Sequence, residues 1–384
     1  MNTSPSFYHS ALGTTANKMN VGYWPKVLEA YDNGNFKESI TGILKYIDPD
    51  LAAKTGNADQ TEFNIPHGSV VVSIKIQNDQ LHVEAPFVKL QDGPLVPLLR
   101  QVTELNFHPL MMTKIILHNE DQLTFHFSSP LGMCEPYKVY DALREICVNA
   151  DKYDDLFIEK FKAVRMREPQ IQRFTPDQLE KTWQTIQEYI TEAEDYVAYF
   201  EGKRWDAFLY DVFQILLMKI DFYVSPQGYL RTELENAIAD LMGRDPYQDR
   251  IHRAKTFLQK LKNYNKEEFL SDIYIIDTFV PYKYSFNLQN TRNNFKNGYE
   301  TAQNEIKKAD YLGATLTLLK DFYSLFYYNM VDETPRNLIT SALEKAGGTE
   351  WKDAAEILME AMETIMNEQK YNALAGSDSV ATAS

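Results

Sequence analysis

The stretch SVVVSIKIQNDQLHVEAP, residues 69–86, alternates apolar and polar residues on both sides of an Asn-Asp pair. Apolar residues at every second position are typical of a strand with one buried face. Asn78-Asp79 is typical of a tight turn between two such strands. The stretch therefore predicts an antiparallel hairpin. Its apolar face carries Val72, Ile74, Ile76, Leu81, Val83 and Ala85.

The residues around this hairpin extend the pattern into a domain. A short amphipathic helix is predicted over 94–107, and a second hairpin over 113–127, with Leu123, Phe125 and Phe127 on one face. Helical spacing precedes the strands and follows them, the last helix running from about 137 to 165. Because each strand has one apolar face, helices must cover that face. We predict an α+β domain over residues 1–168, with an antiparallel sheet and flanking helices.

The second half of the chain is predicted to be an all-α domain. Residues 169–178 are interpreted as a linker, and Thr175-Pro176-Asp177 within them indicates a helix start. The helical domain covers 179–371, and the small polar residues 372–384 are predicted to be a disordered tail. The expected helices lie near 176–199, 203–222, 229–242, 247–262, 266–280, 288–309, 311–330, 335–346 and 350–371.

A glycine between two helical patterns occurs in YDNGNFKESI (31–40), and similar stretches are YFEGKRWDAF (199–208) and EKAGGTEWKDAA (344–355). Such a glycine is expected to supply the positive φ that ends the first helix. The pattern resembles a tetratricopeptide repeat locally, but Gly34 and Gly202 lie 168 residues apart, whereas that repeat recurs every ~34 residues. We favour ordinary helical hairpins and leave open whether the helical half is a diverged repeat array.

Composition narrows the classes of function. The formal net charge of -15 opposes binding of nucleic acid, which is itself a polyanion. The longest apolar stretches are interrupted by charged residues, so no membrane insertion is expected. The residues at the start of the sequence lack the pattern of a secretory signal. With only two cysteines, Cys134 and Cys147, the expected location is the reducing cytoplasm.

Catalytic and metal sites were weighed against simpler interpretations. Cys134 at a helix start, with His118 and His126 nearby, could form a nucleophilic pair, but strand alternation points both histidines to the outer face. His82, His118 and His126 could bind a metal there, although solvent-facing histidines are commoner. Two acidic groups, without the spacing of known metal motifs, are interpreted as solvated helix faces; they are Asp151, Asp154 and Asp155, and Glu188, Glu192 and Asp195. No catalytic residue, cofactor or metal ligand is predicted.

The stretch DFYSLFYYNM, residues 321–330, is the most apolar helical surface in the sequence. A helix that is apolar on nearly all sides is normally buried, so we favour a core helix. The alternative is an aromatic groove for a partner segment. The candidate partner-binding residues are Phe322, Tyr323, Phe326, Tyr327 and Tyr328.

The order of elements in residues 1–168 resembles the type III secretion chaperone-like fold that the YbjN family shares. The matching pieces are VLEAYDNGNFKESITGILKYI, SVVVSIKIQ with LHVEAPFVKL, PLVPLLRQVTELNF, KIILHNEDQLTFHFSS and PYKVYDALREICVNADKYDDLF. The likeness is one of topology and leaves the helical half unmatched. It implies an acidic domain that binds other proteins, through its sheet or by dimerising through a helix, and performs no chemistry.

These observations lead to three hypotheses. The first is a cytoplasmic, non-enzymatic protein-binding protein of the chaperone or adaptor kind, in which a homodimer is also expected. The second is a structural subunit of a larger assembly. The third is an enzyme of unrecognised class that uses His118, His126 and Cys134.

Overall fold

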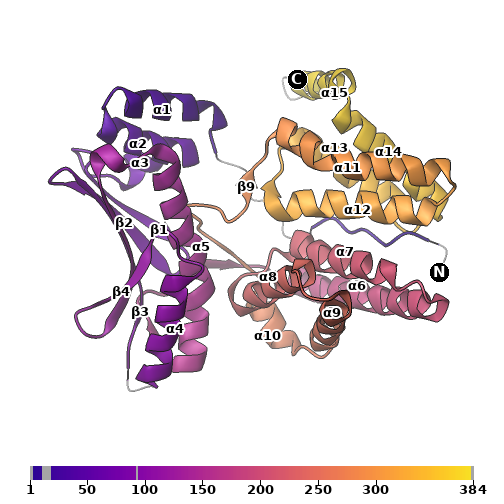
Figure 1. Ribbon diagram of the computed structural model, residues 1–384, viewed down its shortest axis with the longest axis horizontal. Helices are drawn as coiled ribbons and strands as arrows, with labels where there is room; N and C mark the ends of the chain where they lie inside the picture. Colours follow the sequence, from indigo (N-terminus) through magenta and orange to yellow (C-terminus); the bar gives the residue numbers. More distant parts are fainter. Residues whose placement is uncertain (1–2, 11–18, 92–93, 382–384) are drawn as a thin grey trace. The chain divides into compact units, whose positions relative to one another are not determined.

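The computed structural model describes residues 3–10, 19–91 and 94–381. Their contacts divide the chain into two compact units. One unit contains an antiparallel sheet with flanking helices, and the other is built almost wholly from helices (Figure 1). The predicted fold class, an α+β part followed by an all-α part, is therefore confirmed.

The α+β unit comprises Lys18–Arg173 and Tyr274–Tyr282. It begins with a helical hairpin and ends with the pairing of two short strands that are about a hundred residues apart in the chain. Its elements are η1 (Val21–Tyr23), α1 (Trp24–Asp32), α2 (Phe36–Ile47), α3 (Leu51–Thr55), β1 (Glu62–His67), β2 (Val70–Gln77), β3 (Gln80–Lys89), α4 (Leu95–Phe107), β4 (Lys114–His118), β5 (Gln122–Pro130), η2 (Leu131–Met133), α5 (Pro136–Phe161), β6 (Val164–Arg165), β7 (Ile171–Arg173) and β8 (Tyr274–Ile276).

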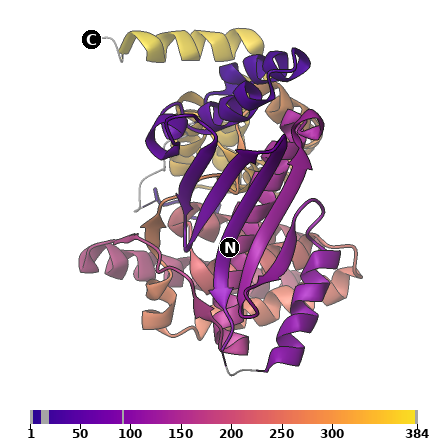
Figure 2. The same ribbon diagram turned by 90° about the vertical axis from the view of Figure 1, so that its left-hand side faces the viewer.

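The sheet has the order β1-β2-β3-β5-β4, and β6 pairs with one end of β3. Figure 2 shows the long strands of the sheet side by side. Both predicted hairpins form. Asn78 and Asp79 both have positive φ, as a tight two-residue turn between twisted strands requires. The predicted apolar face is buried against helices, α5 lying along β2, β3 and β5. Strand period alone was sufficient to identify this face.

Strand β1 was not among the predicted strands. The alternation is present: Phe63, Ile65 and His67 are buried and their neighbours are exposed. Asn64 and Pro66 obscured it, since both are rare in strands. Proline is tolerated here because β1 is an edge strand.

The buried His67 connects β1 to a segment from the other half of the chain. Its Nδ1 accepts a hydrogen bond from the Phe279 N–H (3.0 Å). Its Nε2 lies 3.0 Å from the Cys147 carbonyl oxygen and must therefore carry the proton and donate. Phe279 and Val280 are buried in the core of the α+β unit. Residues 274–282 are thus part of this unit. The prediction of a helix over 266–280 was wrong for its second half, where the β-branched Ile275 and Ile276 lie in β8, which pairs with β7.

Replacing His67 by alanine is expected to lower the free energy of unfolding of the α+β unit by about 2 kcal/mol or more. The change leaves the Phe279 N–H and the Cys147 carbonyl group buried with a lost partner. Urea denaturation would measure the loss. The exposed His252 supplies the control, because its replacement by alanine should change the free energy of unfolding little. Equal effects at both positions would contradict the role of His67.

The helical unit comprises Met1–Asn17, Phe174–Ile273 and Lys283–Ser384. Its first long helix begins with the predicted signal: Thr175 and Gln178 form a capping box, with proline at the first position. The elements are α6 (Pro176–Lys203), α7 (Ala207–Val224), α8 (Gly228–Met242), α9 (Tyr247–Lys262), α10 (Lys266–Ser271), β9 (Tyr284–Ser285), α11 (Leu288–Lys307), α12 (Tyr311–Tyr328), β10 (Asn329–Met330), α13 (Glu333–Ala346), α14 (Trp351–Met366) and α15 (Glu368–Ala381).

The three glycine-containing breaks differ in detail. Gly34 and Gly348 have positive φ (76° and 74°), as expected for residues that end a helix. Gly202 instead lies within α6, and the left-handed residue that ends this helix is Arg204 (φ 60°). The prediction for Gly202 was therefore wrong, by two residues.

The units differ from the predicted domain limits. Residues 3–10 pack with the helical unit, although they were predicted to belong to the domain over 1–168. Residues 372–381, within the predicted disordered tail, are part of α15, while residues 382–384 lie outside the described part. Among the described residues, no helix combines the length and the apolarity needed to cross a bilayer.

Candidate functional site

The aromatic residues of α12 lie mostly in the core. Helix α12 packs against α7, α11 and α14, so it has little free surface. Phe322, Tyr323 and Phe326 are at most 4% exposed, which excludes them from a partner surface of the folded chain. Tyr327 is half-buried, and Tyr328 is 40% exposed. The preference for a core helix is confirmed, and three of the five candidate binding residues are corrected.

The structure does not bring the candidate nucleophile and the histidines together. Cys134 is a buried member of the core, where its Sγ donates to the Pro130 carbonyl oxygen (3.3 Å). Burial raises the pKa of this thiol, which disfavours the thiolate that catalysis needs. His118 is exposed and His126 half-buried, in strands whose core residues alternate with them.

The histidines of the outer face have acidic and basic neighbours. His126 lies opposite Glu84 in one strand pair and Lys114 in the other. His118 Nε2 lies 4.0 Å from Glu84 Oε1, and His82 is two residues along the same strand as Glu84. Within the part of the chain that the structure describes, no three His, Cys, Asp or Glu side chains are placed to hold a metal ion.

The acidic residues at the end of α5 are neutralised by an arginine. Arg165 Nε lies 3.0 Å from Asp154 Oδ2, and its guanidinium also contacts Asp155 and Glu168. Asp154 is buried, so this group is not the solvated face that was predicted. The side chain of Asp151 lies outside the described part of the structure.

The second acidic group leads to a groove on the helical unit. Asp195 is exposed, but Glu192 faces inward and pairs with Lys219 of α7 at 3.0 Å. The Lys219 side chain is only 3% exposed, and its Nζ lies 3.8 Å from the centre of the Tyr189 ring. Burial lowers the pKa of Lys219, and the Glu192 carboxylate opposes this shift. A buried charge of this kind depends strongly on its partner.

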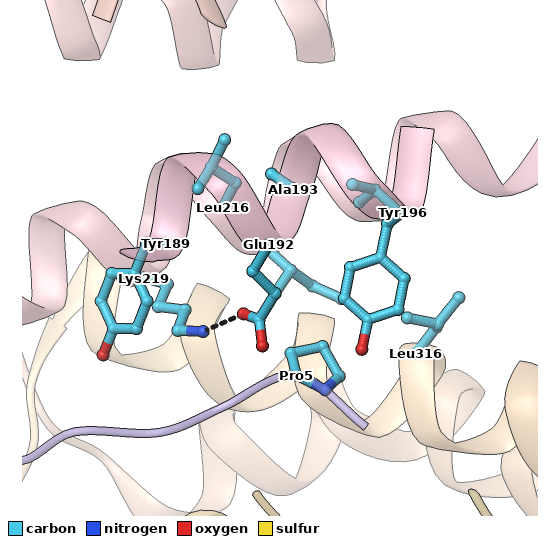
Figure 3. A pocket seen from close by; sticks show the side chains of 10 residues that line it. Pro5, Tyr189, Glu192, Ala193, Tyr196, Leu216, Lys219 and Leu316 are labelled. Carbon is cyan, nitrogen blue, oxygen red and sulfur yellow. Dashed lines mark hydrogen bonds and ion pairs between the residues drawn. The ribbon is translucent and has the colours of Figure 1, made fainter. Parts of the chain in front are cut away.

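Residues 3–10, called here segment 3–10, lie along this groove. Figure 3 shows Tyr189, Glu192 and Tyr196 pointing from α6 toward the segment at Pro5. A cavity of about 20 Å³ remains beside Pro5, room for about one water molecule. Segment 3–10 forms no helix. Its residues Ser4 to Phe7 are buried or half-buried. It occupies the groove as an extended peptide.

Three backbone groups of segment 3–10 form hydrogen bonds to α6. They run from the Tyr196 hydroxyl to the Thr3 carbonyl oxygen (2.7 Å), from the Ser6 N–H to Glu192 Oε1 (2.7 Å) and from the Tyr8 N–H to the Tyr189 hydroxyl (3.1 Å). All three involve backbone groups of the segment. This is how proteins hold extended peptides, since backbone bonds hold the chain and side-chain pockets select its sequence.

The turn between α13 and α14 holds the other side of the segment. The Ser4 N–H donates to the Thr349 carbonyl oxygen (2.8 Å), and the Gly348 N–H donates to the Ser4 carbonyl oxygen (3.2 Å). The Ser4 hydroxyl also donates to the Ala346 carbonyl oxygen. The left-handed conformation of Gly348 shapes this turn, which a side chain would strain. Ser4 is only 3% exposed, so this position accepts only a small residue.

A second exposed feature lies on α4 of the α+β unit. Leu98, Val102 and Leu105 face the core. The rest of the helix surface is mixed, and exposed apolar residues lie there beside Arg100, Thr103 and Glu104. The apolar residues there and in the turn after α4 are 37–89% exposed, and beside them lies a shallow hollow of about 430 Å³. We call these residues the α4 stripe: Leu95, Val96, Leu99, Phe107, Met111 and Met112.

Sequence reasoning missed both features. The α4 stripe was visible as an apolar surface wider than one face of a helix needs. Segment 3–10 carries Phe7 and Tyr8 in a polar context, but nothing in it indicates which part of the chain it contacts. Comparison of the chain with protein-family models, with curated proteins and with solved structures found no match.

Proposed function

We propose that the protein is a non-enzymatic protein-binding protein of the chaperone or adaptor kind, and that the α4 stripe is its contact surface. The observation that carries the proposal is the exposure of Val96 (63%), Phe107 (89%) and Met111 (81%) along one helix and the turn after it. Single exposed apolar residues are ordinary, but several of them on one short helix and the turn after it favour a surface that another protein covers.

The environment of the candidate catalytic residues also supports this proposal. Cys134 is a buried thiol whose pKa is raised by burial, and Asp154 is committed to an ion pair with Arg165. The resemblance proposed for the order of elements in residues 1–168, that of a type III secretion chaperone-like fold, would imply the same class of function. We further propose a cytoplasmic location, because both cysteines are free thiols. No cofactor is part of the proposal.

A structural subunit of a larger assembly is the second candidate. The α4 stripe would then be a permanent interface, and self-association through it would give the expected homodimer. Sedimentation of the purified chain separates the two candidates. A permanent interface would keep the chain oligomeric at low micromolar concentration, whereas an adaptor surface would leave it monomeric until a different protein is added.

A photo-reactive amino acid placed at Val96 or Phe107 in the full chain tests the proposal in cells that produce the protein. Each position is expected to form a discrete protein adduct on illumination. The mass of the adduct distinguishes a second copy from another protein. Leu117, which is 49% exposed on β4, is the matched control and should form none. Absence of adducts at 96 and 107, or equal adducts at 117, would contradict the proposal.

The variant that replaces Val96, Leu99 and Phe107 by serine is expected to fold as stably as the original chain. Exposed substitutions usually change the free energy of unfolding by less than about 0.5 kcal/mol each. The same variant should lose the adduct formed from a neighbouring position such as Met111. Thermal denaturation verifies the fold, and cross-linking verifies the loss.

A further inference from the structure

The groove of the helical unit binds segment 3–10 mainly through its backbone. Five backbone groups between Thr3 and Tyr8 form hydrogen bonds to the groove. None of these bonds belongs to a helix of the unit, and the segment pairs with the rest of the unit only as an isolated bridge between Thr3 and Glu350. The helices therefore do not need this particular segment to satisfy their own backbones.

Side chains of the segment define a short pattern. Ser4 is buried and donates its hydroxyl hydrogen, so this position needs a small hydroxyl residue. Pro5 lies over the cavity, where an N–H group would have to find a partner. The Phe7 ring packs 5.9 Å from the ring of Phe222, and Tyr8 packs 5.7 Å from Tyr189. The pattern is a hydroxyl residue, proline, any residue and two aromatic residues.

The charges around the groove restrict the peptide further. Glu192 accepts the Ser6 N–H, Glu188 bonds the Tyr8 hydroxyl and thereby raises the pKa of that tyrosine, and Glu344 lies 3.2 Å from His9. Segment 3–10 contains no acidic residue. Lys219 neutralises Glu192, but the carboxylates of Glu188 and Glu344 would repel an acidic peptide, whereas a neutral or basic peptide fits.

We propose that this groove is a binding site for an extended, acid-free segment of a partner protein with the same pattern, and that segment 3–10 is a built-in competitor. The partner segment displaces segment 3–10 and takes over its hydrogen bonds. The site is on the helical unit, so this proposal is independent of the α4 stripe.

The cost of displacement follows from tethering. A segment on the same chain as its binding site competes at an effective concentration, which is of the order of millimolar for short flexible linkers. At that concentration, a peptide that binds the open groove with a dissociation constant of about 10 μM would bind the full chain roughly 100-fold more weakly. This difference is the measurable signature of a built-in competitor.

The test uses a fluorescent peptide of residues 1–11 and two proteins, the full chain and a chain that lacks residues 1–10. The peptide is expected to bind the shortened chain with micromolar affinity and the full chain about 100-fold more weakly. Peptides with Ser6→Glu or Phe7→Ala should bind at least tenfold more weakly, and a scrambled peptide should not bind. Circular dichroism and thermal denaturation establish that the shortened chain is folded.

A second protein keeps the test decisive if the shortened chain does not fold. A protease site placed within residues 12–16 of the full chain allows the segment to be cut free while it is bound. The labelled peptide is then expected to exchange into the groove, and the Phe7→Ala peptide to exchange far less. A cut segment that never exchanges would overturn the proposal.

Two further outcomes would also overturn it. A folded, shortened chain that ignores the peptide would show that segment 3–10 is only a structural strap. A full chain that dimerises with concentration, and that the peptide dissociates, would assign the groove to the segment of a second copy. Failure of the α4 cross-linking test would leave this proposal unaffected.

Discussion

Replacing Glu192 by alanine is expected to lower the free energy of unfolding of the helical unit by about 3–5 kcal/mol. The change leaves the Lys219 ammonium group buried beside the Tyr189 ring without its carboxylate partner. It also removes the acceptor of the Ser6 N–H, so segment 3–10 loses a hydrogen bond. Urea denaturation followed by circular dichroism would measure the loss.

The matched control is Glu188→Ala, one turn earlier on the same helix, which leaves Lys219 paired. A double variant with Glu192→Leu and Lys219→Met should recover much of the lost stability, because an apolar pair needs no desolvation of charge. If Glu188→Ala and Glu192→Ala destabilise equally, the ion pair is not the cause. If the double variant is the least stable of the three, the interpretation is also wrong.

The pH dependence of Glu192→Ala provides a second check. Burial lowers the pKa of Lys219, so the unfolded chain binds the proton more tightly than the folded chain. Stability then rises with pH wherever the unfolded state binds more protons. The difference in free energy of unfolding between the original chain and Glu192→Ala should therefore become smaller as the pH rises toward the ordinary lysine pKa of about 10.4. A deficit that does not vary with pH would point to lost packing alone.

Replacing Asp321 by asparagine is expected to raise the free energy of unfolding by about 2–4 kcal/mol at pH 8. Burial raises the pKa of this carboxyl to about 7, and its Oδ2 has no hydrogen-bond partner among the described residues. The carboxyl lies against α11 at Gly298, where a Cβ atom would come within 1.9 Å of Oδ2. Asparagine removes the charge while it keeps the size of the side chain.

The sign of this effect depends on pH. Well below pH 4, Asp321 is protonated in both states, so the substitution should change stability little. As the pH rises from about 4 to about 7, the unfolded state ionises first, and the original chain loses stability that the variant keeps. The exposed Asp195 on α6 is the control, because Asp195→Asn should show no such dependence. Equal gains at pH 4 and pH 8 would contradict an effect of ionisation.

The regular parts of the fold were predictable because their signals are local. The hairpin at Asn78-Asp79 and the helix start at Thr175 each depend on a few neighbouring residues. Segments that join distant parts of the chain were not predictable in this way. Residues 274–282 follow a helix in sequence, but their apolar residues find their partners at His67 and β7.

In the candidate sites, too, the apolar helices were predictable from local signals, but their packing partners were not. The aromatic helix α12 and the apolar helix α4 both have wide apolar surfaces in the sequence. Other helices cover α12, and no described element covers the outer side of Val96 and Phe107. Glu192 reads as one of several surface acids until α7 brings Lys219 within 3.0 Å of it.

By itself, the sequence determined the two hairpins of the sheet, most of the helices and the α+β and all-α character of the two parts. Periodicity and capping residues indicate where each element begins and which of its faces is buried. Both signals are local, so they can be interpreted without knowing which element packs against that face. Only the tertiary structure decided which element covers each face, that segment 3–10 fills a groove of the helical unit, and that Lys219 is buried against Glu192. These outcomes depend on contacts between residues far apart in the chain, which no local pattern records.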